Sequence, residues 1–161
     1  MMLLKKIWLT GALLMLFLLI GAADGLASVH TYPEGSNGVM YRSLQTLRDR
    51  SNQTWQVVLY KRVQGGLTQT LHLRLVGFPG GAALEHPHPL KITAGTEHVW
   101  LATETPPVTD TPNVAEYDLL EVMRELNATT PLRLTVPVQG QPIELPVPPF
   151  VVEEWREVAQ K

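Results

Sequence analysis

The stretch that decides the expected fold is residues 54–78, TWQVVLYKRVQGGLTQTLHLRLVGF. Its two halves, residues 54–63 and 68–78, place apolar side chains at every second position, and the first half is rich in β-branched and aromatic residues. This pattern is typical of β-strands. The Gln64-Gly65-Gly66 triplet between the halves is a turn signal. The stretch therefore predicts an antiparallel β-hairpin.

The two strands of this hairpin differ in the composition of their faces. The first strand carries apolar side chains on both faces, which predicts a strand buried on both sides. The second strand alternates cleanly. Leu71, Leu73 and Leu75 are expected to face the core, and His72 and Arg74 are expected to face outward.

Shorter segments on either side extend the β-structure. Residues 39–49 fit a helix or a strand, and the turn-forming residues that follow them favour a strand. Residues 90–103 are predicted to hold two short strands around Gly95. Residues 132–138 and 143–147 alternate again and predict a second hairpin, and its prolines place at least one of its strands at a sheet edge.

Two helices are expected. Residues 119–126 follow a loop at residues 105–113 and have apolar side chains at the i, i+3, i+4 and i+7 positions, with Asp118 as a capping residue three positions before Glu121. Pro149 begins a C-terminal helix. The apolar stripe of that helix is Val151, Val152, Trp155 and Val158, and its solvated side is Glu153, Glu154, Arg156 and Glu157. The prediction is an α+β fold with a mostly antiparallel β-sheet, sandwich- or barrel-like, and two short helices.

Residues 1–27 have the composition of a secretory signal peptide. Two lysines precede an apolar run at residues 7–20, and the small residues of Gly25-Leu26-Ala27 follow it. The run is shorter than the ~20 residues that a bilayer span needs. The alternative is an uncleaved anchor over residues 7–23.

Cleavage after Ala27 leaves 134 residues, which we divide into a flexible leader at residues 28–38 and a single domain at residues 39–161. This part has eleven Lys and Arg against fourteen Asp and Glu, a formal charge of −3. Nucleic acid is excluded as a main partner, because binding the phosphate backbone needs a basic face. The chain has no cysteine, which excludes disulfides, a thiol nucleophile and Cys-based metal sites.

The loop Glu85-His86-Pro87-His88-Pro89 is the best candidate for chemistry. Imidazoles are common metal ligands, and Gly80 lies six residues before His86, as in the first cupin metal motif. That motif requires a Glu four or five residues after the second His, where this chain has Ile92 and Thr93. We therefore predict no metal site, with His86 and His88 as the candidate ligands if one exists. No catalytic residue, cofactor-binding residue or cofactor is predicted.

Six stretches carry a resemblance to a known family. They are Tyr41-Arg-Ser with Leu47-Arg-Asp, Trp55-Gln-Val-Val-Leu, Leu73-Arg-Leu-Val-Gly-Phe-Pro-Gly, His86 with Pro89-Leu90, Pro112-Asn-Val with Tyr117-Asp, and Val147-Pro-Pro-Phe-Val-Val-Glu-Glu-Trp155. In these stretches the chain resembles the DUF3122-like family of secreted cyanobacterial proteins of unknown function. The resemblance implies an exported protein of the thylakoid lumen or periplasm. It implies no catalytic residue, because the family has none assigned.

We therefore expect a non-enzymatic exported domain that binds a protein partner. The resemblance points to a membrane complex of the photosynthetic apparatus as that partner, with membrane contact only through an uncleaved N-terminal segment. The alternative is a metal-binding or enzymatic domain that uses the His86-Pro87-His88 loop. A third class is a domain that binds a small apolar ligand or pigment inside the sheet.

Overall fold

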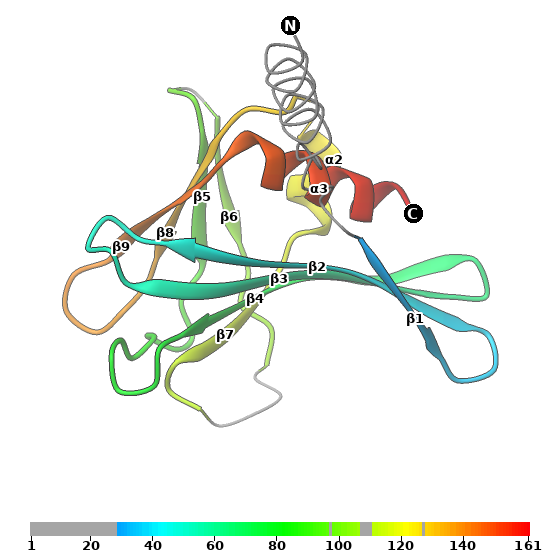
Figure 1. Ribbon diagram of the computed structural model, residues 1–161, viewed down its shortest axis with the longest axis horizontal. Helices are drawn as coiled ribbons and strands as arrows, with labels where there is room; N and C mark the ends of the chain where they lie inside the picture. The colour runs from blue at the N-terminus through cyan, green and yellow to red at the C-terminus, as the bar shows by residue number, and fades with distance from the viewer. Residues whose placement is uncertain (1–28, 97, 107–110, 127) are drawn as a thin grey trace, which may run out of the picture.

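The structure is a computed structural model and describes residues 29–96, 98–106, 111–126 and 128–161. The predicted signal peptide lies outside the described residues. The described residues form two antiparallel β-sheets and two helices, which confirms the predicted α+β class (Figure 1). The two sheets are not closed into a barrel. No helix in the described part of the chain is long and apolar enough to cross a membrane.

The first sheet has five strands in the order β1-β2-β3-β4-β7. The strands are β1 (His30–Glu34), β2 (Gly38–Arg48), β3 (Thr54–Gln64), β4 (Leu67–Gly77) and β7 (Val114–Asp118). The predicted hairpin is confirmed as β3 and β4, in which Leu59 is paired with Leu73. Gly65 and Gly66 both have positive φ at its turn, as the tight turns that match the strand twist require.

The second sheet has four strands in the order β6-β5-β8-β9. The strands are β5 (Leu90–Ala94), β6 (His98–Ala102), β8 (Leu132–Val136) and β9 (Ile143–Val147). The strand pair around Gly95 and the second hairpin are both confirmed. The hairpin strand that contains Pro146 lies at the sheet edge, where the missing N–H of proline removes no ladder hydrogen bond.

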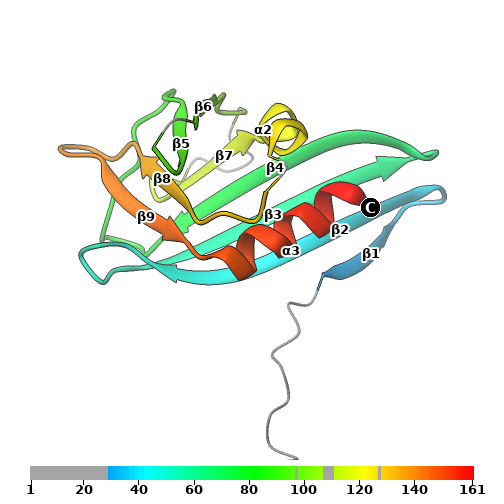
Figure 2. The same ribbon diagram turned by 90° about the horizontal axis from the view of Figure 1, so that it is seen from above.

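The helices are α2 (Leu120–Glu125) and α3 (Pro149–Gln160). Both helices and the second sheet lie on one side of the first sheet (Figure 1), and α3 runs along β2 and β3 (Figure 2). The largest side chains of the shared core are fully buried. They include Trp55, Leu59, Leu73, Tyr117, Leu134, Leu145 and Trp155. This packing stabilises α3, because an isolated helix of its length is marginal in water.

Two of the predicted segments differ from the structure. The prediction of a flexible leader at residues 28–38 is wrong, because β1 forms within this segment and pairs with β2. The hydroxyl of Tyr32 in β1 also accepts a hydrogen bond from Arg42 of β2. The loop expected to lead directly into the first helix is followed by β7 instead. This strand has only five residues, and its place in the sheet comes from its pairing with β4.

Two predicted helix details also differ. The first helix begins after Leu119, one residue later than a cap at Asp118 requires. The Asp118 carboxylate nevertheless accepts a hydrogen bond from the N–H of Leu120. The predicted position of Glu154 on the solvated side of α3 is wrong, because Glu154 is only 2% exposed and accepts a hydrogen bond from Gln45 of β2. The buried face of α3 is therefore wider than its apolar stripe and includes Glu154.

Candidate functional site

The first sheet has a side that faces away from α3 and from the second sheet, which we call the outer face. Alternation along the strands brings a set of aromatic and charged side chains together there. This outer-face cluster consists of Tyr32, Arg42, Tyr60, Arg62, His72, Arg74 and Glu116. Neither helix and no strand of the second sheet, among the described residues, lies on this side (Figure 1).

Glu116 of β7 is the centre of the outer-face cluster. It is only 5% exposed, and three side chains donate hydrogen bonds to its carboxylate. Arg74 donates to Oε2 through Nε at 2.9 Å, and its Nη2 lies 2.8 Å from the same oxygen. His72 donates to Oε1 through Nδ1 at 2.8 Å. The Tyr60 hydroxyl also donates to Oε1. These contacts occupy both carboxylate oxygens and fix the three donors in place.

The protonation states follow from this arrangement. Burial by itself raises the pKa of Glu116, but the hydrogen bonds from Tyr60, His72 and Arg74 and the charge of Arg74 outweigh it and leave the pKa below its ordinary value. Burial and the neighbouring Glu116 carboxylate raise the pKa of Tyr60. Glu116 is therefore ionised and Tyr60 neutral at physiological pH, which is the pairing that a phenol-to-carboxylate hydrogen bond needs.

Arginine side chains surround the two tyrosine rings of the outer-face cluster. The guanidinium carbons of Arg62 and Arg74 lie 5.3 and 5.7 Å from the centre of the Tyr60 ring. Arg42 lies 4.7 Å from the centre of the Tyr32 ring and donates to its hydroxyl at 2.8 Å. Such cation–π contacts restrict the positions of the guanidinium groups.

Apolar side chains continue the outer face beyond the charged cluster. Leu44 is 45% exposed and stands opposite Val58, which in turn is paired with Arg74. Val76 and Val114 form the next pair along β4 and β7, and both are half-buried. The outer face thus combines fixed arginine and tyrosine side chains with a neighbouring apolar strip.

The chemistry that this arrangement favours is recognition. An ionised carboxylate with three donors and a lowered pKa is a poor general base near neutral pH. The neutral Tyr60 has its proton committed to that carboxylate. What the cluster offers to another molecule is the set of guanidinium groups of Arg42, Arg62 and Arg74.

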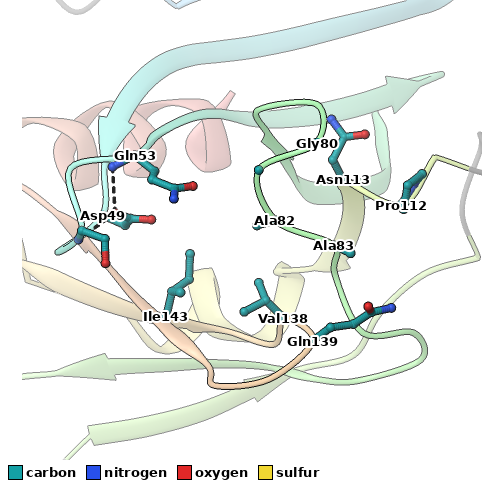
Figure 3. Close-up of a pocket in the computed structure, with 12 residues that line it drawn as sticks. Asp49, Gln53, Gly80, Ala82, Ala83, Pro112, Asn113, Val138, Gln139 and Ile143 are labelled. Carbon is teal, nitrogen blue, oxygen red and sulfur yellow. Dashed lines mark hydrogen bonds between the residues drawn. The ribbon is translucent and has the colours of Figure 1, made fainter.

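A pocket of about 470 Å³ lies at one end of the two sheets, and we call it the end pocket (Figure 3). Its walls come from the turn between β2 and β3, the segment after β4, residues 112–113 and the turn between β8 and β9. Gln53 and Ile143 point into it (Figure 3). Four consecutive small residues, residues 80–83, form one wall and leave the volume open.

The rings of the two histidines that the sequence singled out have different partners in the structure. His86 contacts the Glu104 carboxylate through Nδ1, and the same carboxylate accepts the backbone N–H of His88 at 2.9 Å. The His88 ring lies 4.0 Å from Glu85 instead. Ile92, at the position where the cupin motif has its Glu, is fully buried in β5. Within the described residues, no three His, Asp or Glu side chains are grouped to hold a metal ion.

Sequence reasoning placed His72 and Arg74 on the outward side of their strand, and the structure brings both to Glu116. It missed Glu116 and Tyr60 as members of one cluster. The pairing of β4 with β7 joins residues 38 to 46 positions apart, and no local pattern encodes it. For the end pocket, the run of four small residues at 80–83 is a signal in the sequence.

The fold and the outer face define a small two-sheet α+β domain with an arginine-rich face around the buried Tyr60 and Glu116. The chain belongs to the DUF3122 family, described as protein of unknown function, whose sequence profile matches residues 27–158. The family resemblance noted in the sequence is confirmed. No curated protein and no solved structure matches the chain.

Proposed function

We propose that this protein is a non-enzymatic exported domain that binds a protein partner through its outer face. The single observation that carries the proposal is the outer-face cluster, in which arginine and tyrosine side chains are held by the buried carboxylate of Glu116 and are covered by no described helix or second-sheet strand. Tyrosine and arginine are enriched among the residues that dominate the free energy of protein–protein binding.

Fixed side chains favour binding for an entropic reason. Ordering a long side chain at an interface costs about 0.5–1.5 kcal/mol. Arg74 already makes two contacts with Glu116, and Arg42 is already bound to Tyr32. Part of the entropic cost of ordering these side chains is therefore incurred on folding. Less of it opposes binding, so each contact with a partner contributes more to the free energy of association.

The charges of the outer face indicate the kind of partner. Arg42, Arg62 and Arg74 present three guanidinium groups, and Glu116 and Glu34 are the carboxylates that pair with them. The remaining guanidinium N–H groups suit carboxylates, which arginine binds in a planar, bidentate way. We propose a partner surface that carries Asp or Glu beside an apolar side chain, the latter to cover Leu44.

The compartment and the identity of the partner are proposed on sequence grounds. The composition of residues 1–27 and the resemblance to secreted cyanobacterial proteins support the thylakoid lumen or periplasm. The same resemblance supports a membrane complex of the photosynthetic apparatus as the partner. We propose that the chain itself contacts the membrane only if its N-terminal segment is left uncleaved.

An affinity pull-down with matched variants tests the proposal. The tagged full chain is captured from solubilised membranes of its own host, and its companions are quantified by mass spectrometry. Arg62→Glu reverses one charge on the outer face, and Arg133→Glu makes the same change on the second sheet. We expect one protein to be retained by wild type and Arg133→Glu and to fall at least tenfold with Arg62→Glu. Equal capture by all three would contradict the proposal.

One observation favours a second candidate, a metal-binding or enzymatic domain. The Glu104 side chain, which is almost fully buried, orients His86 through Nδ1, as carboxylates orient the imidazoles of metal-binding and catalytic histidines. The test is the zinc and copper content of the purified protein and of the His86→Ala/His88→Ala double variant. We expect less than one equivalent in both. A tightly bound equivalent that the double variant loses would favour this candidate over partner binding.

A further inference from the structure

The end pocket is separate from the outer face, and its shape is set by hydrogen bonds that need no ligand. The Asp49 carboxylate accepts the backbone N–H groups of Ser51 and Gln53 at 2.8 and 2.9 Å and the indole N–H of Trp55 at 3.1 Å. These three bonds hold the turn between β2 and β3 that forms one wall. A wall held in this way remains in place before a ligand arrives, which lowers the cost of binding.

The opposite wall is fixed by backbone hydrogen bonds across three segments. The carbonyl of Ala83 accepts the N–H of Gln139 at 2.9 Å, and the N–H of Leu84 donates to Pro112 at 2.7 Å. Asn113 donates through its side-chain amide to the carbonyl of Gly77 at 2.8 Å. The segment after β4 is thus anchored on both sides, to the first sheet and to the turn between β8 and β9.

The volume of the end pocket depends on glycine. Gly80 has a φ of +78°, a conformation that other residues adopt only with strain. A Cβ on Gly81 would lie 3.2 Å from the carbonyl oxygen of Phe78 and 3.4 Å from the amide oxygen of Gln53. The backbone therefore passes close to Gln53, and side chains that would fill the space are absent. About 470 Å³ is within the range of small-molecule and peptide side-chain sites.

The lining determines the chemistry of a ligand. Asp49 is the only charged residue in the described lining, and its carboxylate is already bound by three N–H donors. The amide side chain of Gln53 points into the pocket toward the apolar side chains of Val138 and Ile143 (Figure 3). Amides both donate and accept, which matches the peptide group. The described lining has no aromatic ring on which a sugar or heterocycle would stack.

We propose that the end pocket binds an uncharged, extended peptide segment, with an aliphatic side chain against Val138 and Ile143 and a backbone amide paired with the amide side chain of Gln53. A peptide carboxylate is disfavoured there, since the described lining supplies no cation to receive it. This proposal stands on the end pocket alone and is independent of the outer face.

The test follows backbone NMR signals of the ¹⁵N-labelled protein, purified from its own host as it exists there, during titration with small probes. N-acetyl-leucine N-methylamide is the neutral peptide probe, N-acetyl-leucine is its anionic counterpart, and glucose represents neutral small molecules. We expect saturable shifts at Gln53, Gly81 and Gln139 with the neutral peptide probe, and at least tenfold weaker binding of the anionic one.

Two variants complete the design. Gln53→Glu adds a charge at the wall, and Gln64→Glu makes the same change at the other end of β3; both positions are exposed, so folding is retained. We expect at least a fivefold loss of affinity in Gln53→Glu and none in Gln64→Glu. No saturable shift, equal binding of the two leucine probes, or a response to glucose alone would overturn the proposal. The pull-down with Arg62→Glu does not involve this pocket, so the two proposals fail separately.

Discussion

Arg74 of β4 and Glu116 of β7 lie side by side on neighbouring strands, with the guanidinium Nη2 2.8 Å from the carboxylate Oε2. This pair fastens the edge strand β7 to the hairpin at the centre of the sheet. It also holds one of the arginines that the outer face presents. The fold is therefore stabilised by the same buried carboxylate that, in the function we propose, positions Arg74 for a partner.

Replacing that carboxylate tests its structural role. Glu116→Gln leaves Tyr60, His72 and Arg74 with a weaker acceptor in a buried position, and hydrogen bonds to charged groups contribute about 1.5–3 kcal/mol. We expect the free energy of unfolding, measured by urea titration, to fall by about 1–3 kcal/mol. The matched control is Glu121→Gln on the exposed side of α2, which is expected to stay within about 0.5 kcal/mol. Equal effects would show that the cluster contributes no stability.

The lowered pKa of Glu116 predicts how stability depends on pH. A carboxyl whose pKa is lower in the folded state than in the unfolded state stabilises the fold above its ordinary value, about 4.5. That contribution is lost as pH falls from about 4.5 through the lowered pKa. We expect the urea midpoint of wild type to fall more steeply over this range than that of Glu116→Gln. Parallel curves for the two proteins would contradict the assignment.

Trp155 is predicted to be a core residue and not an exposed contact for a partner. It is 0% exposed on the face of α3 that packs against the sheet, and truncating a buried Trp costs about 3–5 kcal/mol. Trp155→Ala should lower the melting temperature by many degrees and reduce partner capture only in proportion to the folded fraction. Phe150→Ala is the control on the same helix, because Phe150 is 57% exposed. Abolished capture with unchanged stability would contradict this prediction.

The contact between half-buried Gln45 and buried Glu154 predicts a non-additive result. The amide of Gln45 donates to the Glu154 carboxylate at 2.6 Å, and the other carboxylate oxygen has no partner among the described residues. Gln45→Leu should cost about 1–3 kcal/mol, because it leaves a buried polar group unsatisfied. Combining it with Glu154→Leu should recover part of that loss in a double-mutant cycle. Additive losses from the two changes would show that the pair does not interact.

The sequence predicted what depends on local periodicity. The alternation in β4 and the 0, 1, 4, 7 spacing in α3 identify their buried faces, because each face is defined by residues a few positions apart. The predicted burial of the 54–63 strand on both sides is wrong, because Gln56 and Arg62 of β3 are exposed on the outer face. Two other features depend on contacts with separate segments. Strand β1 is held to β2 through the contact of Tyr32 with Arg42, and Glu154 is buried where it meets Gln45. The candidate site also depends on contacts between distant segments, because Glu116 reaches Tyr60 only when β7 pairs with β4.

The most direct measurement of the central claim is photo-crosslinking of the full chain in its own host cells. A photoreactive phenylalanine analogue is placed at Leu44 on the outer face, and in a matched variant at Leu101, which is exposed on the second sheet. The outer-face proposal predicts a specific adduct from the Leu44 position that Arg62→Glu removes, and none from Leu101. An adduct from Leu101 alone, or one from Leu44 that persists with Arg62→Glu, would contradict it.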